Sequence, residues 1–449
     1  MSRVWICGCI VISIWSAARL EAGDFGQFRG SAGTGVVSAQ DLPREWGLER
    51  NLAWKVKVPG AGWSQPVVQG SKLFVTAAVS DKDLKPRNFA DGVKSPLSMG
   101  LGFMARAPKI NIQWKVFCYD TSTGQLLWDR TVDEGKPQFA IHPSNTYATE
   151  SPVVDGNGLY VYFASTGKVA GLSLDGELKW QRNVGTFKTS NNFGTGSSLA
   201  MFEGKIFVQN MTEGSADLVC FDADTGEEVW KDTREKKATS WTSPIVWANA
   251  LRTEVVVATA AQVIGYAPDS GERLWTLSNV KGAASGSPCS DRERIYFGSS
   301  DPFSKGPLVA LSAGGSGDLS PEKANKQFDS CAWLIDRAGP GMASPVSNGE
   351  YLYVVDRNIL RCYNANSGER VYQKRIPNTG MIAACPVVVG NELFVVDEDG
   401  SGSLIATGPE FEVLGSGKVE DTVWASPAIV DDSIYIRGVD FLYRFSNGT

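Results

Sequence analysis

The stretch CYDTSTGQLLW at residues 118–128 decides the fold, because close copies of it recur along the chain. Each full-length copy has an aromatic residue, a polar turn that ends in glycine, and then a large aromatic residue. The copies are CFDADTGEEVW (220–230), GYAPDSGERLW (265–275), CYNANSGERVY (362–372) and the shorter SLDGELKW (173–180). The polar turn offers side-chain caps and a glycine that tolerates positive φ, which is typical of a β-hairpin. We expect the tryptophan to begin an outer strand and to pack between neighbouring units.

A second segment precedes each turn: a small residue, a proline, two apolar residues, a Gly or Asp, and another apolar pair. Its anchor occurs eight times, at steps of 86, 47, 45, 44, 57, 41 and 41 residues. The anchors are Pro66, Pro152, Leu199, Pro244, Pro288, Pro345, Pro386 and Pro427. This period matches the roughly 40–50 residues of a four-stranded propeller blade.

Two hairpins per repeat make one four-stranded sheet, which cannot bury both faces alone and must stack on its neighbours. The last repeat stops at residues 442–449 without an outer strand, whereas NLAWKVKV (51–58) is an outer strand, with Trp54, that follows no repeat. We therefore predict an all-β, eight-bladed β-propeller with four antiparallel strands per blade. The N-terminal outer strand closes it by completing the last blade, which removes exposed sheet edges.

The N-terminus has the pattern of a secretory signal peptide: a positive start at Arg3, an apolar run over 4–15, and small residues up to Ala22. We expect residues 1–22 to be removed and 23–449 to form the propeller, in the periplasm or outside the cell. The formal charge is −6 with no basic run, which argues against nucleic acid as a partner. No later segment is apolar for long enough to span a membrane, so we expect no transmembrane span in the mature chain.

The repeats resemble those of the quinoprotein (PQQ) dehydrogenase-like propellers, over essentially all of residues 24–449. The chain is more similar to secreted PQQ-repeat propellers of planctomycete bacteria. The matching stretches are DFGQFRGSAGTGVV (24–37), HPSNTYATESPVVDG (142–156), WTSPIVW (241–247), RAGPGMASP (337–345) and GPEFEVL (408–414). Most members of that family have no established activity, so the resemblance implies a shape rather than a reaction.

The dehydrogenases resemble one another in a vicinal disulfide, a stacking tryptophan and a Ca²⁺ site, all at bound PQQ. This sequence has no two consecutive cysteines. We therefore expect no cofactor and no metal, with PQQ and Ca²⁺ as the alternative. His142 is the only histidine, so multi-histidine metal sites are excluded and its expected role is to cap a loop. Cys118, Cys220 and Cys362 share one repeat position and are expected to be small buried residues between blades.

These observations favour a non-catalytic binding or scaffold propeller of the bacterial cell envelope, with a protein or small molecule as its partner. Two alternatives remain: a reduced PQQ-dependent alcohol or sugar dehydrogenase, and a scaffold that resembles the lipoprotein assisting outer-membrane assembly. Residues 79–111 are an insertion in the first blade. Their apolar part, KSPLSMGLGFMARAPK (94–109), fits either a flap or a loop packed against the ring.

A binding site is predicted at the mouth, the end of the central channel formed by the loops that enter the innermost strands. Three residues before each anchor stand Trp63, Thr149, Gly196, Trp241, Ser285, Met342, Ala383 and Trp424. Equivalent positions in a closed ring lie at equal height, so these side chains should share one face. The candidate ligand-binding residues are Trp63, Trp241 and Trp424, with Asn145, Tyr147 and Asn192 as polar contacts. No residue is predicted to be catalytic.

Overall fold

A computed structural model describes residues 24–38, 41–87, 104–235, 237–280, 285–300, 305–324 and 326–448. The expected signal peptide lies outside these residues, as does 88–103, which holds most of the apolar part of the insertion. Within the described chain, no helix is long and apolar enough to cross a membrane.

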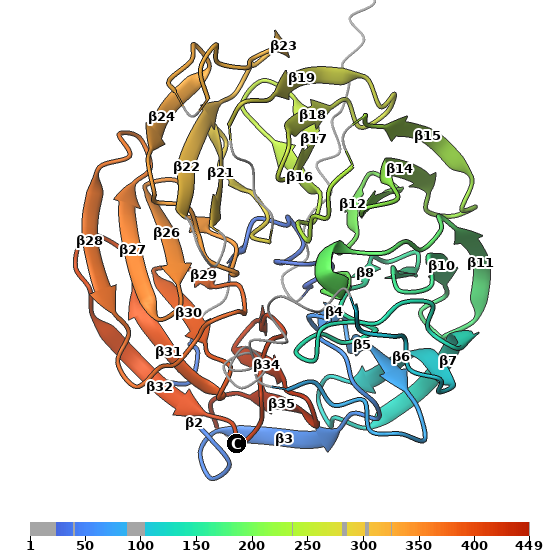
Figure 1. Ribbon diagram of the computed structural model, residues 1–449. Coiled ribbons are helices and arrows are strands. Elements are labelled where there is room, and N and C mark those ends of the chain that lie inside the picture. The colour runs from blue at the N-terminus through green and yellow to red at the C-terminus, as the bar shows by residue number, and fades with distance from the viewer. Residues whose placement is uncertain are drawn as a thin grey trace, which may run out of the picture.

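The described residues form a β-propeller of radially arranged antiparallel sheets (Figure 1). We number its eight sheets by the position of the innermost strand in the chain. Innermost strands of neighbouring sheets contact one another at β4 and β8, β12 and β16, β20 and β25, and β25 and β29, and β33 of sheet 8 contacts β4 of sheet 1. The only described helical element of three residues or more is the 3₁₀ turn η2 (Ser190–Asn192).

From the centre outward, sheets 1 to 4 are formed as follows. Sheet 1 contains β4 (Val67–Gln69), β5 (Lys72–Val79), β6 (Ile112–Asp120) and β7 (Leu126–Gly135). Sheet 2 contains β8 (Val153–Val154), β9 (Leu159–Phe163), β10 (Lys168–Leu172) and β11 (Leu178–Asn183). Sheet 3 contains β12 (Ala200–Phe202), β13 (Lys205–Met211), β14 (Ala216–Asp222) and β15 (Glu228–Thr233). Sheet 4 contains β16 (Ile245–Ala248), β17 (Thr253–Ala258), β18 (Val263–Tyr266) and β19 (Arg273–Leu277), with β23 (Gly317–Asp318) added in parallel.

Sheets 5 to 8 repeat the pattern. Sheet 5 contains β20 (Cys289–Ser290), β21 (Arg294–Ser300), β22 (Lys305–Ser312) and β24 (Cys331–Ile335). Sheet 6 contains β25 (Val346–Ser347), β26 (Tyr351–Asp356), β27 (Ile359–Asn364) and β28 (Arg370–Arg375). Sheet 7 contains β29 (Val387–Val389), β30 (Glu392–Val396), β31 (Ser401–Ala406) and β32 (Val413–Lys418). Sheet 8 contains β33 (Ala428–Val430), β34 (Ser433–Arg437), β35 (Phe441–Phe445) and β3 (Leu52–Lys57).

The N-terminal strand β3 is the outer strand of sheet 8, and Figure 1 shows it beside β35. The pairing is antiparallel and places Trp54 opposite Arg444, as the missing last outer strand predicted. Two further N-terminal strands were not foreseen. β1 (Val36–Val37) and β2 (Glu45–Trp46) pair in parallel with the inner and outer edges of sheet 7. The start of the chain therefore pairs with the two sheets nearest its end.

Five outer-strand tryptophans join neighbouring sheets through a hydrogen bond, as the turn motif predicted, whereas the Trp275 N–H donates to Glu254 of its own sheet. The indole N–H of Trp180 in sheet 2 donates to the Ala223 carbonyl of sheet 3, at 2.8 Å. The same bond runs from Trp54 to Thr121, Trp128 to Leu174, Trp230 to Pro268 and Trp333 to Ala365. The turn glycine lies against the indole ring of the preceding sheet: a Cβ at Gly226 would be 2.4 Å from the Trp180 ring. Glycine is required there by the close approach as well as by its φ of +67°.

The three cysteines at the shared repeat position are buried and free, opposite an aromatic residue of the outer strand. The pairs are Cys118 with Trp128, Cys220 with Trp230 and Cys362 with Tyr372. Burial raises the pKa of each thiol to about 12, so they are not nucleophiles near neutral pH. Their role as small buried residues between sheets is confirmed.

Candidate functional site

One cavity of about 1270 Å³ lies at the mouth. All eight positions three residues before the anchors line it: Trp63, Thr149, Gly196, Trp241, Ser285, Met342, Ala383 and Trp424. The prediction that these side chains share one face is confirmed. Ligand binding at this face remains a prediction.

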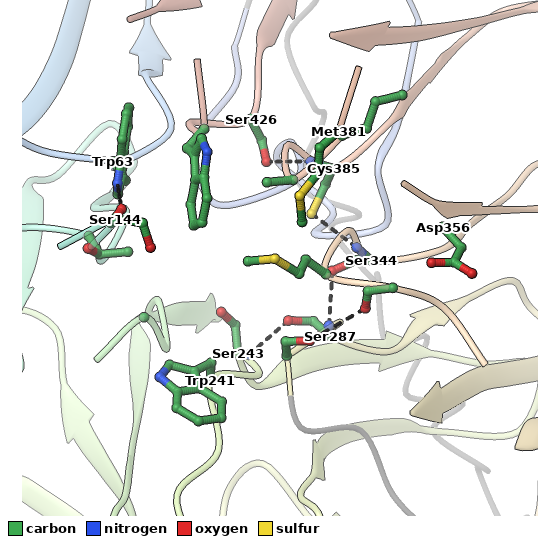
Figure 2. A pocket seen from close by; sticks show the side chains of 18 of the residues that line it. Trp63, Ser144, Trp241, Ser243, Ser287, Ser344, Asp356, Met381, Cys385 and Ser426 are labelled. Carbon is green, nitrogen blue, oxygen red and sulfur yellow. Dashed lines mark hydrogen bonds between the residues drawn. The ribbon is translucent and has the colours of Figure 1, made fainter. Parts of the chain in front are cut away.

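The three tryptophans of the mouth form two separate aromatic surfaces. The rings of Trp63 and Trp424, from sheets 1 and 8, stack with centroids 5.9 Å apart and planes inclined by 22°. Trp241, at the start of sheet 4, meets Phe193 edge-on at 5.9 Å. Trp63 is buried, but Trp241 and Trp424 are only partly buried. Figure 2 shows Trp63 and Trp241 on the border of one open space. Aromatic faces are therefore available to a ligand in the cavity.

Of the three predicted polar contacts, only Asn145 lines the cavity. Its amide, however, is held by the carbonyls of Phe193 and Thr195 and by Thr149. Its groups therefore order the loop rather than face a ligand.

Tyr147 and Asn192 are not among the lining residues. The Tyr147 ring packs in the core between sheets 1 and 2, and its hydroxyl donates to the Phe139 carbonyl at 3.1 Å. Asn192 is buried in η2, where its amide donates to the Ala105 carbonyl at 3.3 Å. Both residues are close in sequence to the mouth loops, but neither side chain reaches the cavity. Tyr147 is buried among apolar side chains, and Asn192 is held by a hydrogen bond within the loops.

A belt of hydrogen bonds crosses from sheet to sheet below the mouth, and the sequence reasoning missed it. From sheet 2 to sheet 8, the residue before the anchor accepts, through its side chain, the backbone N–H of the same position in the preceding sheet, at 2.8–3.3 Å. The bonds run from Gln65 to Ser151, Ser151 to Ser198, Ser198 to Ser243, Ser243 to Ser287, Ser287 to Ser344, Ser344 to Cys385 and Cys385 to Ser426. Figure 2 shows Ser243, Ser287, Ser344, Cys385 and Ser426 of this belt. The serine before the proline in ESP, TSP, GSP and ASP was the available signal.

The opposite end of the channel is closed by residues 24–38. This segment spans several sheets through hydrogen bonds of Phe25, Gly26, Gln27, Arg29 and Gly35. Phe28 reaches the cavity from below and lines it. Among the described residues, the N-terminal segment therefore bounds the cavity at the end away from the mouth.

Arg29 is the centre of this closure. It is 1% exposed, and its guanidinium donates to the carbonyls of Pro288 and Pro345 at 2.6 and 2.5 Å. Its backbone N–H donates to the Gln65 side chain at 2.7 Å. One residue thus ties sheets 1, 5 and 6 together at the end away from the mouth.

Sheets 5 and 6 give the cavity a charged wall. Asp356 lies between Lys305, at 2.5 Å, and Arg361, at 3.1 Å. Although burial opposes the charged form, these two cations hold the pKa of Asp356 below its usual value. Arg337 and Arg357 also line the cavity.

His142 lines the aromatic side of the cavity, and its ring packs at a tilt of 32° against Phe193, with centroids 5.2 Å apart. Its Nδ1 accepts the backbone N–H of Ser144 at 3.2 Å, so it caps the loop as predicted. Burial lowers the pKa of the imidazole, which favours the neutral ring at neutral pH.

The lining residues do not fit a Ca²⁺ ion of the kind that accompanies PQQ in the dehydrogenases. Calcium takes six to eight oxygen ligands, with carboxylates prominent among them. The described cavity wall offers one carboxylate, Asp356, and two cations already occupy it. Within the described ranges, no group of three or more His, Cys, Asp or Glu side chains could hold a metal.

Comparison with known proteins supports this fold. A family model described as Outer membrane protein assembly factor BamB matches residues 14–195, 165–327 and 323–408. Among solved structures, BamB from Moraxella catarrhalis is 11% identical with a TM-score of 0.57, covering 89% of this chain and 98% of that chain. Sqt1 from Saccharomyces cerevisiae is 10% identical with a TM-score of 0.53, covering 76% and 95%. The computationally designed Ika8 protein is 14% identical with a TM-score of 0.51, covering 76% and 94%. Identities this low show the fold alone, and no curated protein matches.

Proposed function

Since the chain belongs to the family described as Outer membrane protein assembly factor BamB, we propose that it is a non-catalytic binding propeller of the cell envelope. In this proposal the eight sheets are eight blades closed by β3, residues 1–22 are an export signal, and 23–449 act in the periplasm or outside the cell. The partner is an envelope protein or a small molecule, not nucleic acid. The likeness to planctomycete propellers stays a prediction from the stretches quoted above.

One observation carries the proposal: the N-terminal segment covers one end of the channel, whereas the other end has partly exposed aromatic side chains. Residues 24–38 cover one end, where the Arg29 guanidinium donates to the carbonyls of Pro288 and Pro345. The other end keeps Trp241 and Trp424 partly exposed around a cavity of about 1270 Å³. A concave, largely apolar site with a few polar groups is the usual form of a binding site.

The family description favours a second, narrower role, that of a scaffold in outer-membrane assembly. A reduced PQQ-dependent dehydrogenase receives less support, because the cavity wall lacks the donors that its Ca²⁺ would need. We propose that the chain works without a cofactor.

The test places a photo-crosslinking residue at Arg357, on the mouth, or at Glu203, an exposed turn residue beside the covered end. We expect the first variant to capture one defined envelope component, identified by mass spectrometry, and the second not to. Equal capture by both variants would contradict binding at the mouth. Dye-linked turnover after addition of PQQ and Ca²⁺ would contradict the non-catalytic role.

A further inference from the structure

The two sides of the mouth cavity differ in chemistry. Trp63, Trp241 and Trp424 come from sheets 1, 4 and 8, whereas the charged residues come from sheets 5 and 6. Among the described lining residues are four cations, Lys305, Arg337, Arg357 and Arg361, and the single carboxylate Asp356. The chain as a whole has a formal charge of −6. A positive wall on an acidic protein attracts an anion into the cavity.

Two of these cations are unengaged. Lys305 and Arg361 share Asp356, but no hydrogen bond or ion pair joins the guanidinium groups of Arg337 and Arg357 to any described residue. Both residues are exposed. A guanidinium binds a carboxylate or a sulfate through two parallel hydrogen bonds, so this pair can hold an anionic group.

The backbone gives these two residues a second, independent mark. Arg337 and Arg357 both have a φ of +57°, in the left-handed region that costs a non-glycine residue free energy. Arg357 is the first residue of the two-residue turn between β26 and β27, a position that glycine favours. Strained backbone of this kind persists only where the surrounding structure holds it, and it is common at ligand-binding positions.

The aromatic side is suited to more than one ring. The Trp63–Trp424 stack and the Trp241–Phe193 pair are separate surfaces on different sheets. The cavity, at about 1270 Å³, exceeds the roughly 300–1,000 Å³ of ordinary small-molecule pockets. A single planar cofactor needs only one such surface. Two surfaces and this volume fit a short oligomer of rings.

The floor argues against an extended peptide. A peptide would bind through free backbone groups of a strand. The backbone N–H groups at Ser151, Ser243 and Ser287 are already used in the belt between sheets. Each serine hydroxyl accepts one of these bonds and keeps its own hydrogen to donate. The floor is therefore lined by serine side chains and offers no free strand backbone to a peptide.

We propose that the mouth cavity binds an acidic oligosaccharide. Sugar rings lie against Trp241 and Trp424, and a carboxylate or sulfate of the sugar is held by Arg337 and Arg357. The proposal names the ligand class of the mouth and so rests on the proposed function.

The test measures binding by calorimetry and tryptophan fluorescence with oligogalacturonate, a sulfated galactan oligosaccharide, a neutral galactan oligosaccharide, PQQ and a polyglutamate peptide. We expect at least one of the two acidic sugars to bind and to change the fluorescence, with an affinity that falls as salt is added. Tighter binding of oligogalacturonate would identify a carboxylate as the anionic group, and tighter binding of the sulfated galactan would identify a sulfate. Failure of both acidic sugars, or equal binding of the neutral one, would overturn the proposal, as would tighter binding of PQQ or the peptide.

The variant Arg357→Gly separates binding from folding. The variant loses a pair of charge-assisted hydrogen bonds, so its affinity for the acidic sugar should fall by about tenfold or more. Glycine also relieves the left-handed backbone, so the melting temperature should not fall. Lys374→Ala, on the exposed outer strand β28, removes the same charge and should leave affinity unchanged. Glu203→Gly relieves a φ of +46° away from the mouth and should likewise leave affinity unchanged.

The outcome also distinguishes this inference from the proposed function. If no sugar binds while crosslinking at Arg357 still captures an envelope protein, the ligand class is wrong and the binding propeller stands. An affinity unchanged by both Arg357→Gly and Arg337→Gly would place any bound sugar elsewhere and overturn the inference.

Discussion

The tryptophans of the outer strands share one position of the repeat, and those of the mouth share another. The two sets differ in their burial and in their hydrogen bonds. Trp230, on an outer strand, is 9% exposed and bonds across to the next sheet. Trp241, at the mouth, is less buried and bonds back to the Gly194 carbonyl of the loop before sheet 3. The outer position is aromatic in most repeats, whereas the mouth position is tryptophan in three and otherwise Thr, Gly, Ser, Met or Ala. The outer contacts are therefore required to hold neighbouring sheets together. The residue type at the mouth position is not restricted in this way and can be adapted to a ligand.

The largest expected effect comes from removing the N-terminal part of the outer contacts. Deleting residues 24–58 removes β1, β2 and β3 together with Trp46, Trp54 and Arg29. The edge strand β35 would lose its partner, so we expect no cooperative thermal transition by circular dichroism. A truncated chain that melts like the full-length protein would show that the first and last sheets do not depend on this strand.

A glycine at the outer contact should matter more than one in an open turn. Gly226→Ala adds a Cβ 2.4 Å from the Trp180 ring, at a φ of +67°. Backbone strain and overpacking together should lower the free energy of unfolding by about 2–4 kcal/mol, measured in urea.

The matched control is Gly204→Ala. Its φ is +70°, but nothing lies within 4 Å of the added Cβ. We expect a loss of about 1–2 kcal/mol from the backbone alone. The difference between the two variants isolates the docking of Trp180, and equal losses would show that the contact contributes little.

These contacts explain why the fold was predictable and the site only partly so. The turn glycine and the tryptophan recur at fixed spacing, so the repeat, the order of strands and the place of Trp54 follow from the sequence. The equal height of Trp63 and Trp424 followed from the same symmetry. Arg337 and Arg357 lie outside the repeat motif, and only the three-dimensional path of their loops brings them to the cavity. Tyr147 was misplaced because a loop residue near the mouth can still turn into the core.

The wall of the mouth has a buried carboxyl beside it, Glu150, just as the outer contacts have Glu254, which accepts the Trp275 indole N–H. Glu150 stands between the lining residues Thr149 and Ser151, is 1% exposed, and neither of its oxygens has a partner within hydrogen-bonding geometry. Burial raises the pKa of this carboxyl from 4.5 to about 7, although the nearby Thr195 hydroxyl favours the charged form.

A carboxyl with a raised pKa in the folded protein binds its proton more tightly there than in the unfolded chain. Its contribution is therefore most favourable below pH 4.5 and declines as the pH rises to about 7. Glu150→Gln should remove this decline and raise the free energy of unfolding at pH 8 by up to about 3 kcal/mol, with little change at pH 4. Urea unfolding at both pH values measures it, with the exposed Glu203→Gln as control. Parallel pH curves for wild type and Glu150→Gln would contradict the assignment.

The smallest expected effect is that of shortening the insertion at the mouth. Val79 pairs with Gln113 across β5 and β6, so replacing residues 81–111 by Asn-Gly gives a two-residue hairpin turn in the same register. In the described part of the segment, Lys85 forms an ion pair with Asp440, the Arg87 N–H donates to the Pro143 carbonyl, and the Ala105 carbonyl accepts the Asn192 amide. Leu84 and Ile110 also pack, partly buried, against the core between sheets 1 and 2. An exposed ion pair contributes at most about 1 kcal/mol, and a shorter loop costs less entropy to close. The melting temperature should therefore stay within about 3 °C of wild type. A collapse in soluble yield would show instead that the insertion belongs to the core, and that the mouth is not free to vary on this side.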